Sequence, residues 1–93
     1  MSSIHDPVSR ASDLNSPLAE RHEAFGQLVL RFQDMAFASA YAVLGDAYLA
    51  EDVAQDAFVS AWQKLSQLRE PAAFPGWFKR IVLRQCNRLT RGK

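Results

Sequence analysis

Cysteine and histidine are scarce in this sequence, which has one cysteine and two histidines. The single Cys86 has no partner for an internal disulfide, and no cysteine–histidine cluster shows the spacing of metal ligands. These absences argue against a disulfide framework and against a zinc site. We therefore expect no metal and no cofactor, and a reducing compartment.

Long apolar runs are also missing. No stretch approaches the ~20 apolar residues that a membrane-spanning helix needs. Residues 1–16 lack the basic segment and apolar run of a secretory signal. We expect no membrane association and a soluble, cytoplasmic chain, whose 93 residues correspond to one small domain.

No catalytic arrangement is recognisable. His5 and His22 have no serine, cysteine or carboxylate partner at a convincing spacing, and the four glycines are isolated, so no phosphate-binding loop is present. Glu51 and Asp52 are adjacent, and neighbouring helical residues point about 100° apart. Cys86 lies beside the apolar face of the last predicted helix, which is typical of a buried, inert thiol. We expect a binding domain and not an enzyme.

The formal net charge of +1 conceals two segments of opposite sign. Residues 32–63 contain five acidic residues and no basic one. In residues 71–93, by contrast, every charged residue is basic. Such an asymmetry indicates two different partners.

Helical periodicity begins at residue 18, and no strand-like alternation is found. Residues 1–17 are rich in serine, aspartate and proline without an apolar period, so we expect a flexible tail there. An N-cap is expected at Asn15 or Ser16. A first helix is predicted over residues 18–44, and Gly45 supplies its left-handed stop.

A second helix is predicted over residues 48–65, capped by Asp46. The prolines and glycine of residues 69–76 break the chain into a connector, and a last helix runs from about Pro75 to Leu89. The sequence thus predicts an all-α, compact bundle of three to four helices over residues 18–93.

The two later helices each have an apolar and a polar face. The exposed face of the second helix carries Asp52, Gln55, Asp56 and Val59. The last helix carries a cationic stripe next to Phe74 and Trp77. The stripe consists of Lys79, Arg80, Arg84, Arg88 and Arg91. Cations attract phosphates and exposed aromatic rings stack on unpaired bases, which favours single-stranded nucleic acid. A solvated helix face and packing of the aromatic rings in the core are the alternatives.

Residues 50–62 and residues 74–82, at this order and spacing, form two blocks that resemble region 2 of bacterial sigma factors of the extracytoplasmic-function type. Residues 50–62, AEDVAQDAFVSAW, are similar to the family's core-binding motif A-E-D-x-x-Q-[DE]-x-F-x-x-A-[WY]. Residues 74–82, FPGWFKRIV, are similar to its F-x-x-W-[LF]-x-R-I-[AV] block. Residues 24–32 and 40–46 resemble the opening helices, so the resemblance covers residues 24–93.

The resemblance implies a transcription-initiation domain that binds core RNA polymerase and that recognises and melts the minus-ten promoter element. The positions implied to dock on the clamp of the largest polymerase subunit are Asp52, Gln55, Asp56 and Val59. The positions implied to contact the non-template strand are Arg69, Glu70, Pro71, Ala72, Ala73, Phe74, Trp77, Lys79, Arg80, Arg84, Asn87, Arg88 and Arg91. An anti-sigma factor is a further implied partner.

The sequence departs from the family pattern at several points. Arg84 stands where many members have asparagine, and residues 70–73 lack the common polar residues, which affects the preferred base. The chain ends without a region 4, so we expect a piece of a longer protein. The rival interpretations are a decoy that binds an anti-sigma factor without contacting DNA, and a generic helical interaction module. The cationic stripe argues against the first and the paired motifs against the second.

Overall fold

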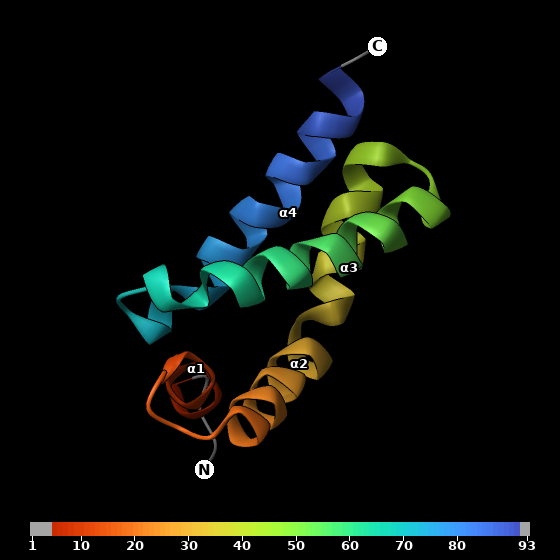
Figure 1. Ribbon diagram of the computed structural model, residues 1–93. Helices are drawn as coiled ribbons and strands as arrows, with labels where there is room; N and C mark the ends of the chain where they lie inside the picture. The colour runs from red at the N-terminus through yellow and green to blue at the C-terminus, as the bar shows by residue number, and fades with distance from the viewer. Residues whose placement is uncertain (1–4, 92–93) are drawn as a thin grey trace.

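The computed structural model describes residues 5–91, which form four α-helices and two 3-10 turns (Figure 1). The helices are α1 (His5–Ser12), α2 (Leu18–Leu44), α3 (Ala47–Lys64) and α4 (Phe74–Arg91), and the turns are η1 (Leu65–Gln67) and η2 (Pro71–Ala73). The predicted all-α bundle is confirmed: residues 5–91 contain no strand. Within this range, no helix combines the length and apolar character needed to cross a bilayer.

Helix α1 lies inside the segment predicted to be a flexible tail, so that prediction is wrong for His5–Ser12. Pro7, Val8 and Ala11 are buried, and α1 packs against α2, η1 and η2 (Figure 1). An isolated helix of eight residues is marginal in water. Helix α1 is therefore stabilised by contacts with the rest of the fold, and such contacts produce no clear apolar period in so short a sequence. The first four residues of the predicted tail lie outside the described range.

Helix α2 begins and ends at the predicted residues. Its end is well predicted because the residue that follows it, Gly45, is a strong helix stop. Gly45 adopts φ 66°, and its N–H donates to the carbonyl of Tyr41 at 2.8 Å. The next residue, Asp46, accepts a hydrogen bond from the backbone N–H of Leu49 at 3.0 Å and caps α3. At the other end of α2 the expected serine or asparagine cap is wrong: Pro17 occupies the N-cap without a side-chain bond.

Aromatic rings from three helices form the centre of the core. Phe58 of α3 stacks on Phe78 of α4 with centroids 4.5 Å apart, and Phe32 of α2 lies 5.2 Å from Phe74. Phe74 and Phe78 are fully buried. Pairs of this kind contribute about 0.5–1.5 kcal/mol beyond the burial of their area. The cluster therefore holds the start of α4 rigidly against α2 and α3.

The connector is compact rather than loose. Between α3 and α4, the turns η1 and η2 leave only residues 68–70 without regular structure. The Glu70 carboxylate accepts from the backbone N–H of Ala72 at 3.4 Å. Helix α4 begins at Phe74, one residue before the predicted Pro75, which therefore lies in the first turn, where proline is tolerated.

Candidate nucleic-acid and protein interface

The four residues predicted to dock on polymerase share one exposed face of α3. Asp52, Gln55, Asp56 and Val59 are three, one and three residues apart, so they lie on one side of the helix, and all are exposed. Val59 is 55% exposed although it is apolar. The opposite side of α3 is buried, so this acidic face, defined as these four residues with Glu51, is available for a partner.

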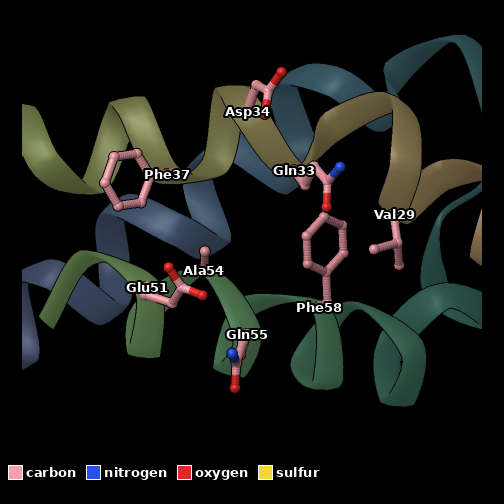
Figure 2. A pocket seen from close by; sticks show the side chains of 8 residues that line it. All are labelled: Val29, Gln33, Asp34, Phe37, Glu51, Ala54, Gln55 and Phe58. Carbon is pink, nitrogen blue, oxygen red and sulfur yellow. The ribbon is translucent and has the colours of Figure 1, made fainter. Parts of the chain in front are cut away.

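A groove between α2 and α3 borders the acidic face on one side (Figure 2). Its volume is about 390 Å³, and it is lined by Val29, Gln33, Asp34, Phe37, Glu51, Ala54, Gln55 and Phe58. Figure 2 shows Phe58 extending from α3 toward Gln33 of α2, while Gln55 points away from α2. The lining thus combines apolar side chains with two carboxylates and contains no cation.

A second groove, between α3 and α4, borders the acidic face on the other side. Its volume is about 450 Å³, and it is lined by Leu49, Asp52, Val53, Asp56, Val59, Ser60, Gln85, Arg88 and Leu89. Three of the predicted docking residues therefore line this α3–α4 groove, and Gln55 lines the other. Arg88, predicted to contact DNA, lines the same groove as Asp52 and Asp56.

The cations of α4 do not all lie on one line. Arg80, Arg84, Asn87 and Arg88 are exposed, and Arg84 and Asn87 lie within about 40° of Arg80 around the helix axis. Lys79 is exposed but about 100° away from Arg80. We call Arg80, Arg84, Asn87 and Arg88 the cationic face. The side chain of Arg91 lies outside the described residues.

The predicted DNA contacts of the connector divide between surface and core. Arg69, Glu70, Ala72 and Ala73 are exposed and Pro71 is partly buried. Phe74 is fully buried and stacks on Phe78 with centroids 5.5 Å apart. Its ring thus completes the aromatic core, and a DNA contact by this residue stays a prediction. Trp77 is partly buried against the core, with its ring 5.8 Å from that of Phe74.

One polar contact between the two faces is absent from the sequence-based predictions. The side-chain amide of Gln85 donates to Ser60 Oγ at 3.0 Å and to the carbonyl of Asp56 at 3.3 Å. The sequence places Gln85 within the apolar stripe of the last helix. A lone amide in such a stripe is the signal that could have indicated a contact to a neighbouring helix.

A second cluster joins three helices near the C-terminal end of α3. The Arg21 guanidinium lies over the Trp62 ring, 5.0 Å from its centroid, and Arg21 Nε donates to the carbonyl of Ala11 at 3.0 Å. His22 and Phe25 flank the same indole, with centroids 4.8 and 5.3 Å away. Trp62, the last residue of the first motif, is thus a junction for α1, α2 and α3.

Groups that could support metal or thiol chemistry are few. Within the described residues, no set of three or more histidine, cysteine or carboxylate side chains could hold a metal ion. Cys86 is fully buried, and desolvation raises the pKa of its thiol. The thiol therefore stays protonated at neutral pH, as expected for an inert core residue.

Comparison with known proteins gives one consistent result. The family model described as sigma-70 region 2 matches residues 28–93. A probable RNA polymerase sigma factor, RfaY of Xanthomonas campestris, is 42% identical over 60 residues, which cover 64% of this chain and 15% of the relative.

Two further relatives match over 60 residues, again 64% of this chain. RNA polymerase sigma-H factor of Pseudomonas aeruginosa is 38% identical, with 31% of its length covered. The ECF RNA polymerase sigma factor SigW of Bacillus subtilis is 32% identical, with 32% covered. The match therefore spans less than a third of each of these curated relatives. No solved structure matches the chain at the same level of significance.

Proposed function

The chain belongs to the sigma-70 region 2 family, of the extracytoplasmic-function type, and from this premise we propose that it binds core RNA polymerase and promoter DNA during transcription initiation. The observation that carries the proposal is the placement of two oppositely charged faces on adjacent helices. The acidic face lies on α3, the cationic face lies on α4, and Gln85 ties the two helices together. One small rigid body can therefore hold a protein and a nucleic acid side by side. Such a role requires a cytoplasmic location.

The polymerase half of the proposal rests on the acidic face. Asp52, Asp56 and Val59 line the α3–α4 groove and Gln55 lines the α2–α3 groove, so a helical partner can lie along α3 and reach into either side. Carboxylates at the rim steer association and fix orientation more than they add affinity. The exposed Val59 supplies apolar contact area. These features fit the clamp of the largest polymerase subunit, if the clamp presents basic and apolar side chains.

The promoter half rests on the cationic face and the connector. Arg80, Arg84 and Asn87 offer a row of donors that follows the phosphates of one strand. The exposed turn η2 lies just before α4, so the connector can receive a base extruded from the minus-ten element. Extrusion costs a few kcal/mol, which is smallest for a strand that is already unpaired. Holding the non-template strand in this way would favour the melted promoter.

The proposal is tested by selection from single-stranded oligonucleotides with a randomised minus-ten segment, with and without a polymerase clamp fragment, at two salt concentrations. We expect selective, salt-sensitive enrichment that strengthens with the clamp and falls when Arg80 and Arg84 are both changed to alanine. Circular dichroism of the variant checks that the helices remain.

The opposite result has a specific meaning. Tight binding of the clamp fragment without any strand preference at either salt concentration would contradict the promoter half. The chain would then fit a decoy that occupies an anti-sigma factor through the same acidic face. An absence of clamp binding would contradict the polymerase half.

A further inference from the structure

Lys64 is the last residue of α3, on the helix whose exposed face is otherwise acidic. A cation in this position has an ordinary role, because it interacts favourably with the C-terminal end of the helix dipole. The structure adds a second feature. Lys64 is exposed and lines a shallow recess between α3 and α4, formed by Ser60, Lys64, Ile81, Arg84, Gln85 and Arg88.

The charges around this recess are all of one sign. Lys64 comes from α3, while Arg84 and Arg88 come from α4, and none of the residues lining the recess is a carboxylate. The acidic residues Asp52 and Asp56 line the neighbouring α3–α4 groove, which Arg88 also lines. Ser60, Gln85 and Arg88 line both spaces, whereas Lys64 and Arg84 line the recess and not the α3–α4 groove.

Neutral donors complete the lining. The Ser60 hydroxyl accepts a hydrogen bond from Gln85 Nε2 at 3.0 Å, which holds its oxygen at the edge of the recess. A hydroxyl has one donor hydrogen besides its acceptor sites, so Ser60 can donate to a ligand oxygen. The recess therefore offers the cations of Lys64, Arg84 and Arg88 and the hydroxyl of Ser60. Groups of these kinds bind the oxygens of phosphates.

The size of the recess limits what it can hold. Its volume is about 20 Å³, and a cavity needs roughly 10–15 Å³ to admit one water-sized group. One phosphate oxygen fits, whereas a nucleobase does not. Any nucleic-acid contact at this site is therefore to the backbone, and it carries no sequence information.

We propose that this recess binds a backbone phosphate of a single nucleic-acid strand lying along α4, with Lys64 as a contact supplied by α3. The proposal rests on the proposed promoter-binding function and extends the DNA surface across the helix boundary. The cationic face then continues from Arg80 and Arg84 to Lys64, and the strand crosses the junction between α4 and α3.

The test is the salt dependence of binding to single-stranded DNA oligonucleotides of several unrelated sequences, measured with the whole chain from about 50 to 200 mM salt. Each phosphate contact contributes about 0.7 to the slope of log K against log salt for single strands. We expect Lys64→Ala to lower this slope by about 0.7 and to weaken binding by the same factor for every sequence. Lys64→Arg should restore the slope.

A matched control separates this effect from a general loss of positive charge. Arg31 is exposed on α2 and lines none of the described recesses between α3 and α4, so Arg31→Ala removes one charge elsewhere. It should leave the slope unchanged. A slope for Lys64→Ala equal to that of the unchanged chain would overturn the proposal, as would equal decreases for the two variants.

The outcomes distinguish this proposal from the function on which it rests. If Arg84→Ala weakens binding and Lys64→Ala does not, the recess proposal fails and the promoter half stands. If the unchanged chain fails to bind any oligonucleotide at the lowest salt, both alone and with the clamp fragment, both fail.

Nuclear magnetic resonance supplies a second readout that distinguishes a strand from a free anion. The side-chain amide signal of Gln85 should shift with an oligonucleotide at concentrations where inorganic phosphate has no effect. A shift with inorganic phosphate alone would contradict a strand-binding role.

Discussion

Gln85 of α4 donates a hydrogen bond to the hydroxyl of Ser60 on α3 at 3.0 Å, and this contact lies between the acidic and the cationic face. The same amide also donates to the carbonyl of Asp56, a residue of the acidic face, at 3.3 Å. Since both bonds come from one side chain, the position of α4 is coupled directly to the backbone that carries the proposed docking residues. The relative placement of the two faces is thus part of the fold.

Changing Gln85 to alanine should therefore destabilise the chain and loosen α4. Loss of both bonds from this partly buried amide should lower the free energy of unfolding by about 1–2 kcal/mol, measured by urea denaturation. Gln63→Ala is the matched control, because Gln63 is exposed on α3 and should change stability by no more than about 0.5 kcal/mol. Equal losses for the two variants would mean that the Gln85 contact is not formed in solution.

Arg21→Ala should detach α1 from the bundle. The change removes the hydrogen bond to the carbonyl of Ala11 and the cation–π contact with Trp62, with a combined expected loss of about 1–3 kcal/mol. Hydrogen exchange should then show faster exchange in α1 than elsewhere. Protection of α1 that is the same in Arg21→Ala as in Arg31→Ala would contradict this role.

Gly45→Ala should destabilise the turn between α2 and α3. The glycine adopts φ 66°, a left-handed conformation that disfavours a Cβ atom, while the space around it is open. The expected loss is therefore that of backbone strain alone, about 1 kcal/mol. A fall in the thermal midpoint is the measurement, and an unchanged or higher midpoint would contradict the left-handed stop.

The Cys86 thiol should resist alkylation in the folded chain. Burial raises the pKa of this thiol, so the neutral form is favoured. The stability linked to the neutral thiol is fully present below its ordinary pKa and is lost as pH rises through the raised pKa of the folded state. We expect slow reaction with iodoacetamide at pH 8 that becomes fast in urea. Cys86→Ala should lack the corresponding loss of stability at alkaline pH, and rapid alkylation without urea would contradict the burial.

The parts of the fold that could be predicted from the sequence are those with strong local signals. Gly45 and Asp46 mark the end of one helix and the start of the next through backbone conformation and capping, and both predictions are confirmed. The missed helix α1 has no such signal. Val8 and Ala11 are buried because α1 packs against α2, η1 and η2, and this packing cannot be read from the residues near them in the sequence.

The candidate site shows the same division. The acidic face follows from helical spacing on α3, and the residues named there are exposed as predicted. The burial of Phe74 is one of two alternatives that the sequence leaves open, because an aromatic residue beside a connector suits both a stacking platform and a core. The sequence also could not place Lys64 with the proposed DNA-binding residues. Arg84 and Arg88 lie on another helix, and they line one recess with Lys64 only in the folded chain.

If the acidic face and the cationic face serve two different partners, a change in one face should leave binding of the other partner intact. A polymerase clamp fragment and a single-stranded minus-ten oligonucleotide are each titrated into the Asp56→Ala and Arg84→Ala variants. We predict that Asp56→Ala weakens only clamp binding and that Arg84→Ala weakens only oligonucleotide binding. Loss of both activities in both variants, with the helices intact, would contradict the separation of the faces.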